Sequence, residues 1–102
     1  MSSNLIDEYT EFVKNSYRYD FGHFDILYLS NGLGGEAGEV QNDVKKLIRK
    51  LHDGGDIRDE KYIDKIKDEL GDVLWYIFAL SNKLKIPFKD IINHNMNKNK
   101  SK

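Results

Sequence analysis

The sequence predicts an all-α protein with a four-helix bundle-like architecture: two long antiparallel helices plus two shorter ones, completed by oligomerisation. Three observations support this prediction. The 102 residues include a single proline, so few positions break a helix. No segment shows the alternation of apolar and polar residues that is typical of a half-buried strand. Two long segments instead repeat apolar residues at intervals of three and four, the spacing of one helix face.

The first predicted helix covers residues 4–16. Asn4 can cap its amino end, and Asp7 and Glu8 lie in its first turn, where the helix dipole favours acidic side chains. Residues 17–25 follow as an aromatic-rich, irregular segment. We expect this segment to pack as a connection between helices.

The second predicted helix runs from about 26 to 52. Its apolar stripe consists of Leu33, Ala37, Val40, Val44, Leu47 and Leu51. Four glycines interrupt its first half, although each glycine costs a helix interior about 1 kcal/mol relative to alanine. These glycines, which we expect to allow close helix packing or access of a ligand, are Gly32, Gly34, Gly35 and Gly38.

The third predicted helix spans about 59–84. Its stripe consists of Ile63, Ile66, Leu70, Val73, Ile77, Leu80 and Leu84. Pro87 suits the first turn of a short fourth helix over about 87–97. A chain of this length supports a single core, so we expect one all-α domain over residues 1–98 and a polar tail over 99–102.

The charge balance and the absence of cysteine exclude several classes of function. The chain has 16 Lys and Arg against 17 Asp and Glu, and a net charge of −1 favours neither a nucleic-acid nor a membrane partner. Without cysteine there is no disulfide, thiol catalysis or cysteine-ligated metal. No apolar run approaches the roughly 20 residues of a membrane span, and the first residues do not resemble a signal peptide. We therefore expect a cytoplasmic protein.

Two pairs of acidic residues flank the apolar stripes of the long helices. Glu36 and Glu39 are three residues apart on the second helix. Glu69 and Asp72 have the same spacing on the third. Side chains at positions i and i+3 are neighbours on a helix surface. If the stripes pack together in an antiparallel hairpin, all four carboxylates converge beside the core.

Converging carboxylates repel one another unless a cation lies between them. Hard divalent cations such as Mg²⁺ or Mn²⁺ prefer oxygen ligands, and they can lower the pKa of a bound water. The alternative is a solvated acidic helix face, which is the ordinary explanation for either pair taken alone. The spacing by itself leaves both interpretations open.

The segments around these acids resemble the two signature segments of the MazG-like family of all-α nucleoside triphosphate pyrophosphohydrolases. Residues 32–40 read GLGGEAGEV and residues 67–76 read KDELGDVLWY, which contain the E-x-x-E and E-x-x-D motifs of that family. The resemblance extends over about residues 9–98. One departure is Gly35, where many members of the family carry a further glutamate.

The resemblance implies four helices per chain, assembled as a homodimer or homotetramer. It also implies hydrolysis of a (deoxy)nucleoside triphosphate to the monophosphate and pyrophosphate, with Mg²⁺ as cofactor and Mn²⁺ as a possible substitute. Metal binding and catalysis are thereby assigned to Glu36, Glu39, Glu69 and Asp72. Asn95 and Lys98 match the family's N-x-x-K element, whose polar groups contact substrate phosphates.

Four other residues are weighed as parts of such a site. Tyr76 lies one turn after Asp72, so its ring contacts either a base or sugar of the substrate or the core. His23 either lines the nucleotide pocket or packs as an ordinary histidine among aromatic residues. Asp43 is an additional acid of the site or, as the more ordinary expectation, a solvated residue. Trp75 is expected to be covered by another subunit, since a large indole is seldom left exposed.

Together these observations predict a Mg²⁺-dependent nucleoside triphosphate pyrophosphohydrolase that acts as a homo-oligomer. Metal-assisted attack of water at a phosphorus would release pyrophosphate, and the resemblance suggests a role in nucleotide-pool housekeeping. One alternative is a non-enzymatic helical interaction module that uses the same stripes as an oligomer seam. The other is a regulator that binds a nucleotide without cleaving it.

Overall fold

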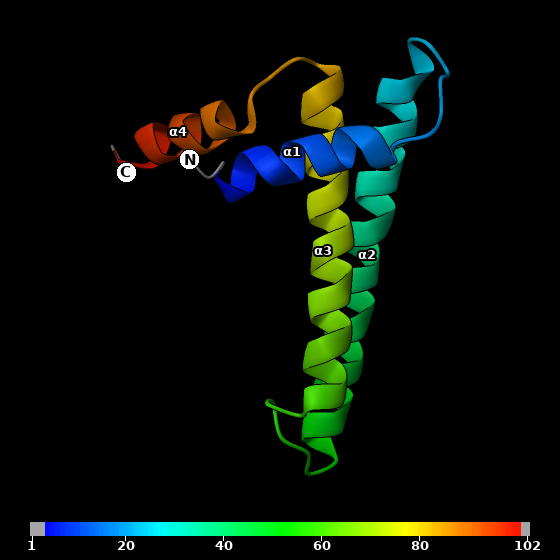
Figure 1. Ribbon diagram of the computed structural model, residues 1–102. Coiled ribbons are helices and arrows are strands. Elements are labelled where there is room, and N and C mark those ends of the chain that lie inside the picture. The colour runs from blue at the N-terminus through cyan, green and yellow to red at the C-terminus, as the bar shows by residue number, and fades with distance from the viewer. Residues whose placement is uncertain (1–3, 101–102) are drawn as a thin grey trace.

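A computed structural model describes residues 4–100, and in this range it contains four α-helices and no β-strand (Figure 1). The helices are α1 (Leu5–Ser16), α2 (Phe24–His52), α3 (Glu60–Lys83) and α4 (Phe88–Asn99). The predicted all-α class and the four predicted helices are confirmed. The predicted polar tail starts at the last residue of α4, and residues 101 and 102 lie outside the described residues.

The long helices α2 and α3 form an antiparallel hairpin that makes most of the contacts between helices (Figure 1). Leu29 and Leu47, near the two ends of α2, are both buried, and Leu29 is part of the core cluster. The predicted stripes are buried only in part, because Val44 is 39% exposed and Leu70 is 52% exposed. A turn that contains Gly54 at a φ of +94° joins the two helices at the end opposite the core.

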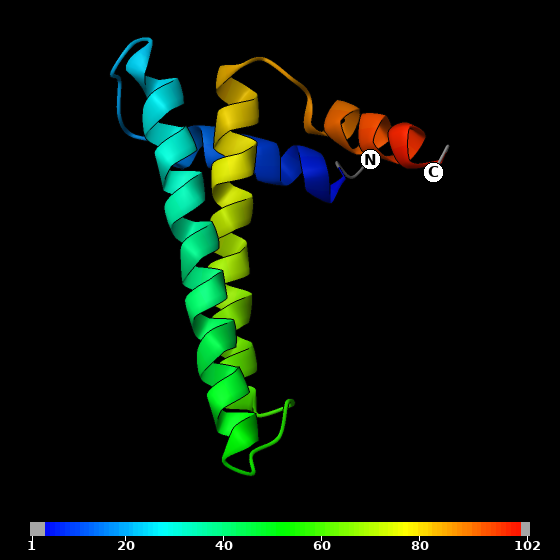
Figure 2. The same cartoon turned by 180° about the vertical axis from the view of Figure 1, so that it is seen from behind.

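Helix α1 crosses the hairpin near one end, and α4 projects sideways from the same end, so neither short helix runs alongside the long ones (Figures 1 and 2). The buried core gathers at this crossing and contains Val13, Leu29, Phe78 and Ala79. The Phe78 ring makes an edge contact with Tyr9 of α1 at 4.7 Å between centroids. It also stacks on Phe88 of α4 at 3.8 Å. The core of the single chain therefore lies at one end, and within residues 4–100 the far part of the hairpin consists of two helices that pack on each other.

The helix ends fall within two residues of their predicted positions. Asn4 caps α1 as expected, since its Oδ1 accepts a hydrogen bond from the Asp7 amide at 2.8 Å. Asp59 caps α3 in the same way, at 3.0 Å from an amide of the first turn. Pro87 precedes the first turn of α4 and does not lie within it, and α2 begins at Phe24, earlier than predicted.

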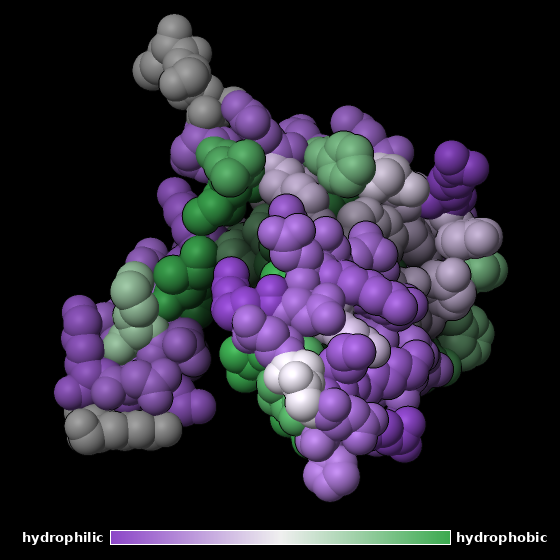
Figure 3. All heavy atoms as spheres, turned by 90° about the horizontal axis from the view of Figure 1, so that it is seen from below, coloured by the Kyte–Doolittle hydropathy of each residue, from purple (hydrophilic) through white to green (hydrophobic). Residues whose placement is uncertain are grey.

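Many large hydrophobic side chains stay exposed in the single chain. Leu27 and Ile48 on α2 are each 56% exposed. Seen from the loop end of the hairpin, hydrophobic side chains gather beside the hairpin where α1 and α4 project (Figure 3). Exposed apolar surface of this kind is typical of faces that contact other proteins. Within residues 4–100, no helix is long and apolar enough to cross a membrane.

Candidate metal centre

The α2–α3 hairpin brings together acidic side chains from distant parts of the sequence. One carboxylate oxygen from each of Glu36, Glu69 and Asp72 lies within 4.8 Å of the other two. Glu36 and Glu69 are half-buried, whereas Asp72 is exposed. The close approach of Gly32 on α2 to Tyr76 on α3 shows which residues of the two helices lie opposite each other. Glu36 lies four residues after Gly32 on α2, and Asp72 lies four residues before Tyr76 on α3. The antiparallel pairing therefore places Glu36 opposite Asp72.

The electrostatics of this cluster are most evident at Glu69. Burial raises the pKa of the Glu69 carboxyl above its ordinary value of 4.5. A hydrogen bond and the charge of Glu36 raise this pKa further, followed by the charges of Asp43 and Asp72. A carboxyl pKa raised by other carboxyls means that the full negative charge of the cluster is unfavourable.

The donor set fits a hard divalent cation. Mg²⁺ and Mn²⁺ prefer carboxylate oxygens, and here two rigid helices supply three such groups. Glu36, Glu69 and Asp72 form no ion pair with any other residue of the described chain. Their negative charge is therefore available to a bound cation.

Glu39, the fourth predicted ligand, lies outside this group of three. It follows Glu36 by one turn of α2, and its side chain is exposed. Its assignment as a ligand stays a prediction.

Asp43 is buried, contrary to the expectation of a solvated residue. It is 2% exposed, and within residues 4–100 neither of its carboxylate oxygens has a hydrogen-bond partner. The signal in the sequence is its position seven residues after Glu36, which is two turns along the same helix face. Because α3 covers that face, the side chain lies in the seam between the two long helices.

Tyr76 lies beside the carboxylates. It lines a pocket of about 370 Å³ together with Glu36, Asp72 and Trp75. Burial is the main cause that raises the pKa of its hydroxyl. A Cβ at Gly32 would collide with the Tyr76 ring, which explains why α2 has a glycine at that position. Contact between Tyr76 and a substrate stays a prediction.

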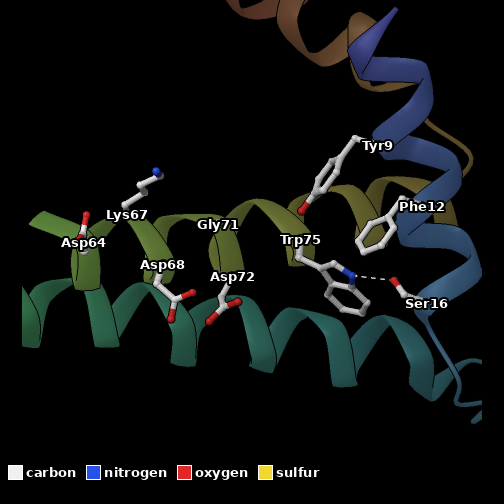
Figure 4. A pocket seen from close by; sticks show the side chains of 9 residues that line it. All are labelled: Tyr9, Phe12, Ser16, Asp64, Lys67, Asp68, Gly71, Asp72 and Trp75. Atoms are coloured by element: carbon white, nitrogen blue, oxygen red, sulfur yellow. Dashed lines mark hydrogen bonds between the residues drawn. The ribbon is translucent and has the colours of Figure 1, made fainter. Parts of the chain in front are cut away.

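An open groove of about 800 Å³ lies between α1 and α3, next to Asp72 (Figure 4). Tyr9 and Phe12 line it from α1, and the indole nitrogen of Trp75 donates a hydrogen bond to Ser16 Oγ at 2.9 Å. Helix α1 of the same chain thus covers the indole that another subunit was expected to cover. Burial and the charge of Asp72 raise the pKa of Tyr9, so α1 reaches the edge of the cluster.

The remaining predicted substrate contacts lie elsewhere in the chain. His23 is the residue before α2 and is exposed. Asn95 and Lys98 line a hollow of about 470 Å³ formed by α4 and the connection before it. Because α4 projects from the end of the hairpin, the single chain does not bring these residues to the carboxylates (Figures 1 and 2).

Known proteins resemble this chain over most of its length. The family described as MazG nucleotide pyrophosphohydrolase domain matches residues 24–102. A curated relative, the gene 37 protein of Mycobacterium phage L5, is 39% identical over 77 residues, which are 76% of this chain and 65% of the relative. The chain therefore spans less than two thirds of the length of that relative. No solved structure matches the chain.

Proposed function

Because this chain belongs to the MazG nucleotide pyrophosphohydrolase family, we propose that it hydrolyses a nucleoside triphosphate to the monophosphate and pyrophosphate with Mg²⁺ as cofactor. The observation that carries the proposal is the meeting of Glu36, Glu69 and Asp72 within 4.8 Å. In the reaction, a water oxygen forms a bond to the α-phosphorus. The bond from that phosphorus to the oxygen bridging to the β-phosphorus breaks.

The three carboxylates would hold the cation, with Glu39 as a further ligand from the next turn of α2. Bound Mg²⁺ supplies charge that offsets the charge of the triphosphate, and it lowers the pKa of a bound water. One of the carboxylates accepts the proton that the attacking water releases. A triphosphate without a cation would meet only negative charge here, so we expect no hydrolysis in EDTA.

Tyr76 is the residue best placed to contact the nucleoside. Its ring borders the pocket that also contains Glu36 and Asp72. An aromatic ring in this place can stack on a base or pack on a sugar, and its hydroxyl can hydrogen-bond to either.

We propose that the active form is a homodimer or homotetramer. The exposed hydrophobic side chains of α2 and α3 support this proposal, because contact with a second copy would bury them. In such an assembly, Asn95 and Lys98 of one copy would contact the phosphates bound by another, and His23 would line the nucleotide pocket. We place the reaction in the cytoplasm, where nucleoside triphosphates and Mg²⁺ are both present.

The test is incubation of the purified protein with a panel of ordinary and modified nucleoside triphosphates, in Mg²⁺ and in EDTA. Chromatography identifies the products. Monophosphate plus pyrophosphate, formed only with Mg²⁺, is the expected result. Diphosphate plus orthophosphate would overturn the proposed reaction. No turnover with either Mg²⁺ or Mn²⁺ would favour an interaction module, and long-lived nucleotide binding without product would favour a regulator.

The matched variants are Glu69→Gln and Asp64→Asn. Glu69→Gln keeps the size of the side chain but removes a carboxylate from the cluster, so we expect hydrolysis to fall by at least about a hundredfold with the helical content unchanged. Asp64 is exposed on the same helix and points away from α2 (Figure 4), so its amide variant should keep wild-type activity. Equal activity of wild type and Glu69→Gln would contradict the assignment.

A further inference from the structure

Asp43 is the buried acid for which the described chain provides no partner. It is 2% exposed, and neither carboxylate oxygen accepts a hydrogen bond. Asp25, the other buried acid, is different. It accepts hydrogen bonds from the Tyr17 hydroxyl and the Phe21 amide, and it pairs with Lys83 at 3.3 Å. A buried carboxylate without such partners is strongly unfavourable, so a cation beside Asp43 would be strongly stabilising.

The geometry of the hairpin directs Asp43 toward Glu69. Because Gly32 lies opposite Tyr76 and the helices are antiparallel, Asp43 of α2 lies opposite Lys65 of α3. Glu69 lies about one helical turn from Lys65, on the side of the carboxylate cluster. Helical side chains lean toward the N-terminus of their own helix. Because the helices are antiparallel, the side chains of Asp43 and Glu69 lean toward each other.

The electrostatics agree with this placement. The charge of Asp43 is one of the causes of the raised pKa of Glu69, after burial and the effects of Glu36. Asp43 lies outside the group of three whose oxygens meet within 4.8 Å, about one turn further along the seam from Glu69. It is buried, whereas Glu36 and Glu69 are half-buried and Asp72 is exposed.

We propose that Asp43 is a further ligand of the divalent cation, which it binds together with Glu69 at the inner end of the cluster. This inference rests on the proposed function, because it extends the same cation site. The site then reaches into the seam between α2 and α3. A cation held there is shielded from water by the two helices and interacts more strongly with its ligands.

The experiment measures binding of Mg²⁺ and of Mn²⁺ to the full chain by calorimetry, without nucleotide, together with thermal unfolding in EDTA. Asp43→Asn keeps the shape of the side chain and removes its charge. We expect the dissociation constant for the cation to rise by at least about 10- to 100-fold, which is the loss that removal of even an indirect partner of a metal site causes. In EDTA the same variant should melt at a higher temperature than wild type, because it no longer buries an unpartnered charge.

Asp64→Asn serves as the control, because it removes an exposed acid at nearly the same level of the hairpin. Its cation affinity and its melting temperature in EDTA should match those of wild type. Unchanged affinity in Asp43→Asn, while wild type binds Mg²⁺, would overturn the inference and leave the proposed function standing. A variant that melts lower in EDTA or fails to fold would also overturn it, since a purely structural role predicts that loss. If wild type binds neither cation, both proposals fail.

Discussion

Tyr17, Asp25 and Lys83 form a buried polar contact that joins three parts of the chain. The Tyr17 hydroxyl, just after α1, donates to the Asp25 carboxylate in the first turn of α2. Lys83, at the end of α3, pairs with the same carboxylate at 3.3 Å and lies over the Tyr17 ring at 5.0 Å. Because Asp25 is 3% exposed, these partners are what make its burial tolerable.

Replacing Tyr17 by Phe is therefore expected to lower the free energy of unfolding at neutral pH by about 1.5–3 kcal/mol, the contribution of a hydrogen bond to a charged group. The aromatic ring and its packing remain in this variant, so the loss in the free energy of unfolding measures the contribution of the hydroxyl alone. Urea unfolding followed by circular dichroism measures it. Tyr19→Phe is the control, because Tyr19 is 53% exposed and its hydroxyl has no hydrogen-bond partner within residues 4–100, so this change should be close to neutral.

The contact between Tyr17 and Asp25 also predicts how the loss in the free energy of unfolding depends on pH. The hydrogen bond from Tyr17 is the main cause that lowers the pKa of Asp25 below its ordinary value of 3.8. A lowered carboxyl pKa stabilises the fold above the unfolded-state pKa, and this stability is lost as the pH falls through the folded-state value. The difference in the free energy of unfolding between wild type and Tyr17→Phe should therefore have its largest value at pH 7 and become smaller below pH 3.8. A constant difference from pH 7 to pH 3 would contradict this linkage.

The glycines of α2 predict opposite responses to alanine. Gly34→Ala should raise the free energy of unfolding by about 0.5–1 kcal/mol, because nothing lies within 4 Å of the added Cβ and alanine favours the helix. Gly32→Ala should lower it by about 1–3 kcal/mol, because the Tyr76 ring must move. Urea unfolding in EDTA compares the two variants. A stabilising Gly32→Ala would show that the Tyr76 ring is free to shift.

Sequence reasoning reached much of the candidate site at the level of single residues. Glu36, Glu69 and Asp72 could be grouped because helical spacing and an antiparallel hairpin place them on facing surfaces. The burial of Asp43 depends on which neighbours α3 provides, and that requires the register between the helices. The pairing of Asp25 with Tyr17 and Lys83 depends in the same way on how three segments pack, which no local pattern contains.

Among the helices, α3 owes its defined start to a single side chain. Asp59 accepts the hydrogen bond of the Lys61 amide in the first turn at 3.0 Å. Asp59→Ala should lower the free energy of unfolding by about 1 kcal/mol. Asp64→Ala, an exposed change within the same helix, should stay within about 0.5 kcal/mol of wild type. Equal effects of the two changes, measured by urea unfolding, would rule out the capping role.

The helix boundaries were predictable because apolar spacing, acidic first turns and capping side chains are all local signals. The start of α2 was placed too late for a physical reason. A turn at Gly22, with a φ of +62°, passes directly into the helix, since the Asp25 amide donates to the Gly22 carbonyl at 3.1 Å. The glycine and aromatic residues of this segment are not typical of the start of a helix, so the sequence does not indicate that the turn leads directly into α2.

For the molecule as a whole, cation binding should appear as stability. A ligand that binds only the folded state adds about 2.7 kcal/mol at 100 times its dissociation constant. We expect Mg²⁺ to raise the melting temperature of wild type well above its value in EDTA. Glu69→Gln should respond much less to Mg²⁺, although in EDTA it should melt higher than wild type because like charges no longer meet. Equal Mg²⁺ responses of the two proteins would place the cation elsewhere.

The arrangement of whole helices was harder to predict than their number. The stripes on α2 and α3 indicate an antiparallel pair, whereas nothing in the connections determines that α1 crosses this pair and that α4 projects from its end. That crossing follows from aromatic contacts such as Tyr9 with Phe78 and Phe78 with Phe88, which join three separate helices.

The closed end of the hairpin, residues 53–59, lies at the opposite end from the aromatic core (Figure 1). Helix α2 continues for about four turns beyond Glu36 before it reaches this end. Extra turns of helix added in equal number to both arms at this end would leave the facing acids in register. Doubling the length of the turn itself would cost only about 0.6 kcal/mol of chain entropy. The spacing in sequence between the two acidic pairs can thus change without moving the facing acids, and this end is a suitable place to insert a tag or a fluorescent label.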